Sequence, residues 1–355
     1  MTTPPIQHLN AYLLPLVQTL DALGYVTRNI DPIGYVHLLA RANLKPEPLR
    51  DALAMRPWPE PYSTLRPVLD AGAASALAAV DGLIEAAGPP EDITQAWRAL
   101  RHYPRALETL YPLAGVLPQL NRFFLDPAQR DDMDLTRGLM QQPAPKDTGV
   151  ICFGDDASAR DAVWVYVPET YDPATPHPVV VALHGGSGNG RAFLWSWVCA
   201  ARTRGAIVIA PSSVGQTWAI QGRDSDSPHL AQILRFVQQR WTIDPTRILL
   251  TGMSDGGTFT YTSGLATGSP FTHLAPVAAA FHPMLVAMAD TERMRGLPLH
   301  IIHGDRDWMF PRQMADDAAN HFTTAEANVT YRPIVDLSHA YGADLSSMIL
   351  DWLLA

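Results

Sequence analysis

The segment Gly252-Met253-Ser254-Asp255-Gly256 places a serine between two glycines in the pattern G-x-S-x-G. This pattern is typical of a nucleophile elbow, a sharp turn from a strand into a helix with the serine at its apex. The two glycine positions need to lack side chains, because the strand and helix backbones nearly touch there; Gly257 eases the same crowding. Ser254 is therefore a candidate nucleophile above a helix N-terminus. Its hydroxyl is too weak an acid to attack a carbonyl near pH 7 unaided, so a base must act with it.

Apolar runs that alternate with helical segments are the elements that would position this serine. Eight runs predict strands: 149–153, 162–167, 179–183, 206–210, 248–251, 274–279, 299–302 and 329–334. Helical patterns lie between them, as in 230–240, and an amphipathic segment at 344–354 ends the chain. This alternation is the signature of a mostly parallel sheet covered on both faces. Ser254 follows the fifth predicted strand.

Eight strands in this order, with the elbow after the fifth, resemble the α/β-hydrolase fold. In that fold the acid follows a later strand and the base follows the last one. The segment 303–311 is similar to the superfamily's H-G-x-x-D-x-x-x-P pattern, which places the acid at Asp307. Asp305 is the alternative, because it lies two residues nearer to the strand. His339 matches the position of the base. The resemblance implies that His339 takes the proton of Ser254 and that Asp307 holds the imidazole in the required tautomer.

A tetrahedral intermediate also needs two N–H donors that already point at its oxyanion. The backbone N–H of Asp255, directly after the candidate nucleophile, is one expected donor. The other is expected from the glycine-rich loop 184–188, with Gly186 as the first choice and Ser187 as the second. A phosphate-binding loop is the competing interpretation of these glycines, but the loop contains neither G-K-[ST] nor G-x-G-x-x-G.

Two segments, 184–186 and 247–257, carry the resemblance to particular branches of the superfamily. They look most like the phospholipase/carboxylesterase and dienelactone-hydrolase branches. They also resemble the polyhydroxybutyrate-depolymerase and feruloyl-esterase group, which often has Asn in place of Asp255. The resemblance covers about residues 150–355 and implies a serine hydrolase that cleaves a small-molecule carboxylic ester through an acyl-enzyme intermediate, without a cofactor. The negative side chain of Asp255 could disfavour anionic acyl groups.

Residues 1–140 differ in composition and predict a separate all-helical domain. Leucine and alanine recur there at helical spacing, and 18 of the 31 prolines fall within residues 1–150. Prolines start helices at the first turn and break them inside, so several short helices are expected, cut near Pro32, Pro46, 57–61, 89–90 and Pro127. Residues 141–148 lack periodicity and predict a linker to a catalytic domain at 149–355. The helical domain is expected either to cover the active site as a cap or to serve as a structural or dimerising extension, which leaves a homo-oligomer open.

Composition excludes several classes of function. The net charge of −9 argues against a nucleic-acid partner, which needs a basic face. No apolar run of 18 residues predicts a membrane span, and no secretory signal is visible. Cys152 and Cys199 are expected to be inert buried thiols, so a cytoplasmic location is expected. The scattered histidines predict no metal site.

The acyl pocket is harder to place from the sequence. Trp308, next to the candidate acid, and the aromatic segment 193–197 could line it, although such residues are more often core. Two other functions share the predicted fold. One is a serine peptidase or aminopeptidase, because the same chemistry cleaves amides. The other is a binding protein without catalytic activity.

Overall fold

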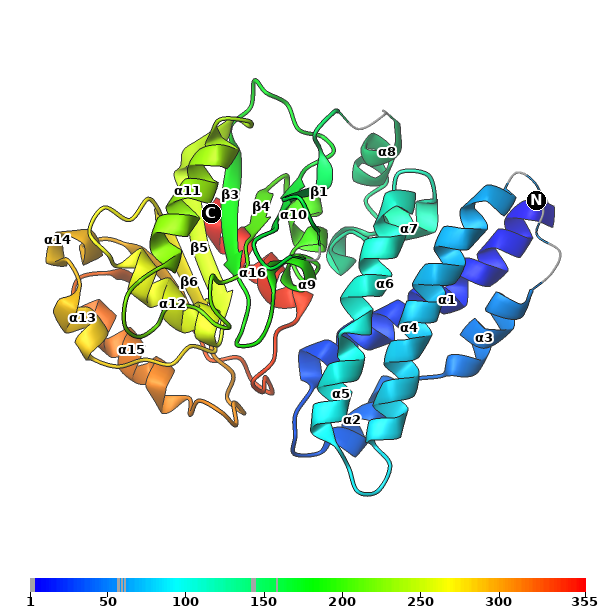
Figure 1. Ribbon diagram of the computed structural model, residues 1–355, viewed down its shortest axis with the longest axis horizontal. Coiled ribbons are helices and arrows are strands. Elements are labelled where there is room, and N and C mark those ends of the chain that lie inside the picture. Colours follow the sequence, from blue (N-terminus) through cyan, green and yellow to red (C-terminus); the bar gives the residue numbers. More distant parts are fainter. Residues whose placement is uncertain (1–3, 56–57, 59, 61, 142–144, 158) are drawn as a thin grey trace. The chain divides into compact units, whose positions relative to one another are not determined.

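The computed structural model describes residues 4–355 except 56–57, 59, 61, 142–144 and 158, and the chain divides into two compact units (Figure 1). Met1–Gln142 form the helical unit, and Pro143–Ala355 form the α/β unit. Within the predicted linker 141–148, residues 142–144 lie outside the described residues. The same holds for all three prolines in 57–61 that were expected to cut a helix.

The helical unit contains two long helices and several short ones. The helices are α1 (Pro4–Asn29), α2 (Tyr35–Ala42), α3 (Pro46–Ala54), η1 (Tyr62–Leu65), α4 (Arg66–Ala86), α5 (Ile93–Leu100), α6 (His102–Leu110), η2 (Tyr111–Leu113), α7 (Pro118–Phe123), η3 (Pro127–Gln129) and α8 (Met133–Gln141). Pro46 begins α3 and Pro127 begins η3, as first-turn prolines do. Several short helices are present as expected, but α1 and α4 are longer, with 26 and 21 residues, and α1 keeps Pro15 inside it.

Helix α4 lies at the centre of the helical unit. Leu69, Ala73, Ala76, Val80 and Leu83 are buried on it, and it packs against α1, α3, α5 and α6. In the described part of the chain, only 62–86 is long and apolar enough to cross a membrane, and 39% of its most apolar window is buried inside the protein. An apolar helix packed on four others is what the core of a helical bundle requires.

The α/β unit is built on one eight-stranded sheet in the order β1-β2-β4-β3-β5-β6-β7-β8. The strands are β1 (Gly149–Phe153), β2 (Val163–Val167), β3 (His177–Leu183), β4 (Ile207–Ala210), β5 (Ile243–Met253), β6 (His273–Val277), β7 (Pro298–Ile301) and β8 (Asn328–Tyr331). β2 is antiparallel to β1 and to β4, and all other pairs are parallel. Each of the eight predicted strands is present, and β5 is the most extended beyond its prediction.

Helices cover both faces of this sheet. They are α9 (Gly190–Leu194), α10 (Val198–Arg204), α11 (Asp226–Gln238), α12 (Asp255–Gly264), α13 (Met284–Met288), α14 (Thr291–Met294), α15 (Gln313–Thr324) and α16 (Ala343–Leu354). Apolar side chains of α11, α12 and α15 join those of the strands in one buried core. α10 and α16 pack against each other, and Figure 1 shows α16 behind the sheet, opposite α11 and α12. The architecture is the α/β-hydrolase fold that the sequence predicts, with an N-terminal helical region.

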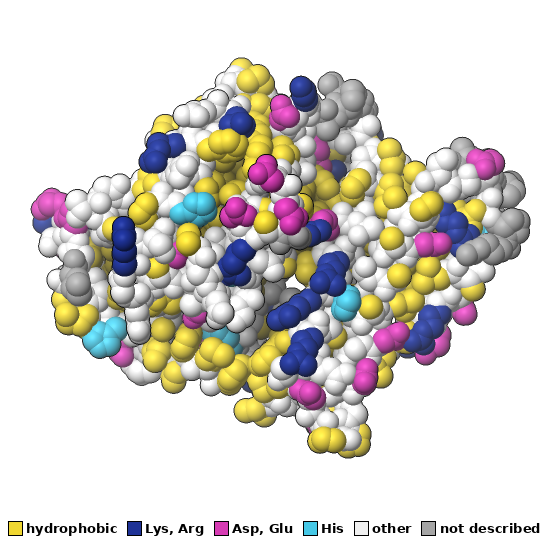
Figure 2. Space-filling view, viewed as in Figure 1, with side chains coloured by type: hydrophobic (Ala, Val, Ile, Leu, Met, Phe, Trp, Pro, Cys, Tyr) yellow, Lys and Arg dark blue, Asp and Glu magenta, His cyan; other side chains and the backbone are white. Residues whose placement is uncertain are grey.

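Two further features of the α/β unit concern its cysteines and its charges. Within the described residues, Cys152 and Cys199 form no disulfide bond, and both are half-buried instead of buried as the sequence predicts. Figure 2 shows acidic and basic side chains interspersed over the face of the α/β unit in view.

Candidate active site

Ser254 lies at the turn between β5 and α12 in a backbone conformation that side chains rarely adopt, with φ 57° and ψ −117°. The glycines around it are required by close backbone contacts. A Cβ built on Gly252 would lie 2.5 Å from the carbonyl carbon of Gly256, and one on Gly256 would lie 2.5 Å from the Leu183 carbonyl oxygen. A Cβ on Gly257 would lie 2.7 Å from the Val277 oxygen. The sequence pattern therefore specifies this turn by leaving no room for any other residue.

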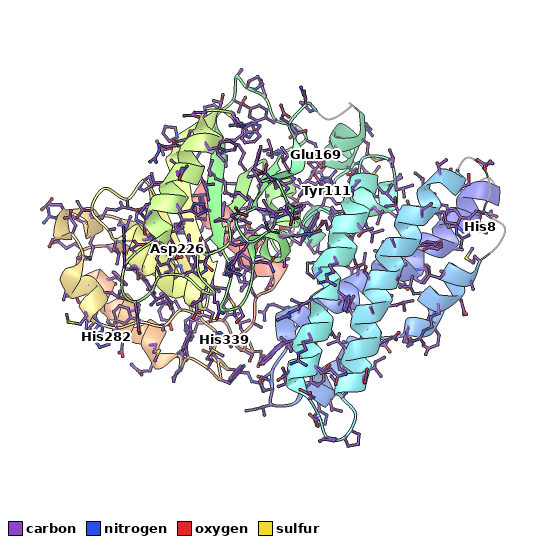
Figure 3. The ribbon with its side chains drawn as sticks, in the orientation of Figure 1. His8, Tyr111, Glu169, Asp226, His282 and His339 are labelled. Carbon is purple, nitrogen blue, oxygen red and sulfur yellow. The ribbon has the colours of Figure 1, made fainter. Side chains whose placement is uncertain are left out.

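Ser254, His339 and Asp307 form one continuous chain of hydrogen bonds. His339 Nε2 lies 3.0 Å from Ser254 Oγ, and His339 Nδ1 lies 2.8 Å from Asp307 Oδ2. A carboxylate can only accept, so Nδ1 carries the proton and Nε2 is left to accept the proton of the serine hydroxyl. The structure thus brings together the three side chains that the sequence selected. Figure 3 shows His339 on the loop between β8 and α16.

The side chain of Asp307 is fully buried and is held at both oxygens. Oδ1 accepts from the N–H groups of Met309 at 2.9 Å and of Phe310 at 2.8 Å, and Oδ2 accepts from His339. Burial by itself raises the pKa of Asp307, but the hydrogen bonds from His339 and Phe310 and the nearby imidazoles outweigh it, so the net pKa is lowered. The carboxylate therefore stays ionised beside the imidazole.

Asp305, the alternative acid, lies elsewhere. Its side chain forms an ion pair at 3.2 Å with the half-exposed Arg312, and it has no bond to His339. Asp307, in contrast, is held in place by His303, a histidine to which the sequence analysis assigned no role. Nε2 of the buried His303 donates to the Phe310 carbonyl oxygen at 2.8 Å and lies 3.5 Å from Asp307 Oδ2. It thereby fixes the turn that presents the Asp307 carboxylate.

The loop 184–188 lies against Ser254, as its predicted role requires. A Cβ on Gly185 would lie 3.6 Å from Ser254 Cβ, and one on Gly186 would lie 2.7 Å from Asp255 Oδ2. Ser187, the second-choice donor, has a φ of 58° at the tip of this loop. The N–H groups of Gly186 and Asp255 remain the predicted oxyanion donors.

His184 connects this loop to the loop that follows β4. Its Nδ1–H donates to Gly185 O at 2.7 Å, and its Nε2 accepts from the Ser213 N–H at 3.1 Å. These two bonds require the neutral imidazole. Burial lowers the pKa of His184 to about 4, so the neutral form is maintained at ordinary pH. Trp218 adds a third bond from its Nε1–H to the His184 carbonyl oxygen at 2.8 Å.

The loop after β4 contributes contacts that the sequence analysis missed. The Arg160 guanidinium donates hydrogen bonds to both loops. Its acceptors are the Gly188 carbonyl oxygen on one loop and, on the other, the carbonyl oxygens of Ser213, Gly215 and Gln216 and the Ser213 hydroxyl. The buried Asp226 carboxylate accepts from the N–H groups of Val214 and Ala219 at 2.7 and 2.8 Å. Thr217 Oγ1 donates to Asp255 Oδ2. Residues 211–225 carry no periodic pattern, so no sequence signal pointed to them.

The aromatic residues proposed for the acyl pocket separate into two groups. Trp308 is 40% exposed, and its ring meets the His339 imidazole edge-to-face at 6.1 Å between centroids. It thus lies beside the candidate base, where a substrate could contact it. Leu194, Trp195 and Trp197 are buried, so these three residues of the segment 193–197 belong to the core and not to an exposed pocket. Phe193 and Ser196 of this segment are partly exposed, and Phe193 packs against Tyr341.

Metal ligands do not gather at this site. Among the described residues, no group of three or more His, Cys, Asp or Glu side chains could hold a metal ion. Figure 3 shows His282 and His339 on separate loops of the α/β unit.

No family model matches the chain. A bifunctional acetylxylan esterase/xylanase of Neocallimastix patriciarum is 29% identical over 159 residues, which are 43% of this chain and 22% of that protein. Feruloyl esterase C of Emericella nidulans is 26% identical over 165 residues, which are 44% of this chain and 59% of that protein. The chain therefore spans about a fifth of the first relative and about three fifths of the second.

Solved structures that align with part of the chain include esterases and serine hydrolases. A thermostable esterase aligns at 19% identity over 58% of this chain and 62% of its own, with a TM-score of 0.47. A fluorophosphonate-binding serine hydrolase of Staphylococcus aureus aligns at 16% identity over 58% of this chain and 97% of its own, with a TM-score of 0.46. The strand order of the sheet and the turn at Ser254 are those of the α/β-hydrolase fold, so the resemblance stated above is confirmed at the level of the fold. Its two curated relatives are named as acetylxylan and feruloyl esterases.

Proposed function

We propose that the protein is a serine hydrolase that cleaves carboxylic esters with a catalytic triad of Ser254, His339 and Asp307. One observation carries the proposal, the hydrogen-bond chain of 3.0 Å from Ser254 Oγ to His339 Nε2 and 2.8 Å from His339 Nδ1 to Asp307 Oδ2. A serine, an imidazole and a buried carboxylate in this order can activate an oxygen nucleophile.

The proposed mechanism follows from these contacts. His339 Nε2 takes the hydroxyl proton while Ser254 Oγ attacks the ester carbonyl, and the imidazolium returns that proton to the leaving alcohol. Asp307 stabilises the imidazolium without taking a proton itself. Water then attacks the acyl-enzyme, with His339 again as the base. The N–H groups of Gly186 and Asp255 would bind the oxyanion, and losing one such donor costs about 3 kcal/mol of transition-state stabilisation.

A fluorophosphonate probe tests the nucleophile directly. Labelling of the native protein that disappears in Ser254→Ala is the expected result, because the probe reacts only with an activated serine. A native protein that is not labelled would contradict the proposal and favour the binding protein without catalytic activity.

The substrate class is proposed to be a carboxylic ester, in keeping with the names of the two curated relatives. A panel of p-nitrophenyl esters and peptide p-nitroanilides separates esterase from peptidase. We expect turnover of the esters, with acyl esters of graded length defining the chain that the site accepts. Turnover restricted to the anilides would favour the peptidase instead.

Three predictions are carried forward as proposals. They are a cytoplasmic location, a homo-oligomer, and a cap or dimerising role for residues 1–140. Cell fractionation and sedimentation of the full chain test the first two, and the truncation described in the Discussion tests the third.

A further inference from the structure

Asp255 places a carboxylate directly beside the candidate nucleophile. It is the first residue of α12, and its own backbone N–H is a predicted oxyanion donor. Its Oδ2 accepts a hydrogen bond from the Thr217 hydroxyl and lies against the backbone of Gly186, where a Cβ would come within 2.7 Å. The carboxylate is therefore fixed between the loop after β3, the loop after β4 and the start of α12. The proposed acyl group must enter next to these three segments.

The charged side chains of Arg160 and Asp226 bind groups other than the Asp255 carboxylate. Arg160 uses its guanidinium on carbonyl oxygens and a hydroxyl, and the buried carboxylate of Asp226 accepts two backbone N–H groups. Within the described residues, Asp255 has no ion pair, and its Oδ1 has no hydrogen-bond partner. Asp255 is half-buried, so water screens its charge only in part.

We propose that Asp255 determines specificity by rejecting esters whose acyl group carries a negative charge. This inference rests on the proposed function, since it needs the acyl group at Ser254. By covalent geometry the carboxylate lies within several ångströms of the reacting carbonyl. When the acyl chain carries its own carboxylate past Asp255, we expect the repulsion between the two negative charges in this partly desolvated site to lower kcat/KM about tenfold. A neutral acyl chain of the same length does not experience this repulsion.

A pair of substrates that differ only in charge tests the inference. p-Nitrophenyl valerate and mono-p-nitrophenyl glutarate share a five-carbon acyl chain that ends in a methyl group or in a carboxylate. The quantity measured is the ratio of kcat/KM for valerate to kcat/KM for glutarate. The variant is Asp255→Asn, which keeps the backbone donor and the side-chain shape. The control is Asp317→Asn on α15, which removes one negative charge away from the site.

The inference predicts a valerate preference in the native protein that falls about tenfold in Asp255→Asn and stays within about twofold in Asp317→Asn. Equal ratios in the native protein and Asp255→Asn would overturn it. So would an equal fall in both variants, because net charge rather than position would then be the cause.

A salt titration of the native protein tests the same inference without a variant. Raising the ionic strength from about 0.02 M to about 0.5 M shortens the screening length several-fold and should reduce the valerate preference. A preference that rises with salt would contradict the inference, because added ions cannot strengthen a repulsion between like charges. If the native protein hydrolyses neither these two esters nor p-nitrophenyl acetate, the proposed function fails. If it hydrolyses valerate and glutarate at the same ratio in every variant, only the inference fails.

Discussion

Asp307 and Asp305 are separated by one residue, yet they occupy entirely different environments. One is fully buried between two backbone N–H groups and His339, and the other pairs with Arg312 at the surface. This contrast gives a direct test of which carboxylate acts in the proposed triad.

Asp307→Asn is expected to lower kcat on p-nitrophenyl esters by about ten-thousandfold. The amide can donate to Nδ1 of His339, so the imidazole would carry its proton on Nε2 and could not accept the proton of Ser254. Asp305→Asn is the matched control, and kcat/KM should stay within about twofold because an exposed ion pair contributes little. Steady-state kinetics of the two variants show which carboxylate is the catalytic acid. An equal loss of kcat/KM in both variants would contradict the assignment of Asp307.

The residues that could be predicted from the sequence are those whose role follows from a motif and from their position after a strand. Ser254, Asp307 and His339 could be found because each follows the end of a predicted strand. His184, Arg160 and Thr217 could not, because their roles depend on which loops meet in space. His184 illustrates the difficulty, since it stands in a glycine-rich motif but acts through bonds to Gly185 and to Ser213, 29 positions away.

At the scale of elements, the turn between β5 and α12 depends on direct backbone contact. Gly256→Ala would place a methyl group 2.5 Å from the Leu183 carbonyl oxygen, which cannot move without shifting β3. We expect the free energy of unfolding to fall by about 3 kcal/mol. Gly115→Ala serves as the control, because its Cβ would meet nothing within 4 Å and the change should be within about 0.5 kcal/mol. Urea unfolding of both variants provides the measurement.

The interface between the sheet and α16 contains a buried histidine. His300 on β7 lies against the Trp352 ring of α16, and its Nδ1 has no hydrogen-bond partner. Burial lowers the pKa of His300 from its usual 6.5 to about 4. The unfolded chain therefore binds this proton first as the pH falls. The stability that the neutral imidazole allows is fully present above pH 6.5 and is lost as the pH falls from 6.5 toward 4.

His300→Phe should reduce this acid sensitivity. A buried histidine whose pKa is lowered from 6.5 to about 4 on folding can account for about 3 kcal/mol of lost stability across that pH window. His184 is unchanged in the variant, so its contribution to the acid sensitivity remains. The free energy of unfolding, measured at intervals between pH 7 and pH 4, should have a smaller slope in His300→Phe than in the native protein. His321→Phe, which changes an exposed histidine on α15, is the control and should keep the native slope. If the free energy of unfolding of His300→Phe changes with pH as steeply as that of the native protein, burial of His300 does not cause the acid sensitivity.

The strands could be predicted more reliably than their ends. Short apolar runs bounded by turn residues were sufficient to locate all eight. β5 begins at Ile243 and not at the predicted residue 248, because pairing of Ile243 with His177 of β3 extends it. Such tertiary pairing has no signature in the local sequence. In the helical unit, proline was given too much weight as a breaker, since α1 continues through Pro15.

At the scale of the whole molecule, the α/β unit has a hydrophobic core of its own. Every residue of the proposed mechanism belongs to this unit. A chain that begins at Pro145 is therefore expected to fold and to hydrolyse p-nitrophenyl acetate. Cooperative thermal unfolding of the truncated chain and its kcat/KM, compared with those of the full chain, check this expectation. Loss of folding would contradict it.

The kinetics of the same truncated chain test the cap. If residues 1–140 cover the active site, their removal should change KM for long acyl esters more than for acetate, because only a long chain reaches beyond the site. Unchanged ester kinetics in a soluble truncated chain would exclude the cap and leave the structural or dimerising role.

The backbone conformation of Ser254 has a consequence for the evolution of the protein. A residue held at φ 57° and ψ −117° costs about 1–3 kcal/mol that a glycine would not pay. Ser254→Gly should therefore melt at a higher temperature than Ser254→Ala while both are inactive, as differential scanning calorimetry would show. Lineages released from selection for hydrolysis would gain thermal tolerance by replacing this serine with glycine, and an inactive homologue with glycine at this position would be a natural product of that drift.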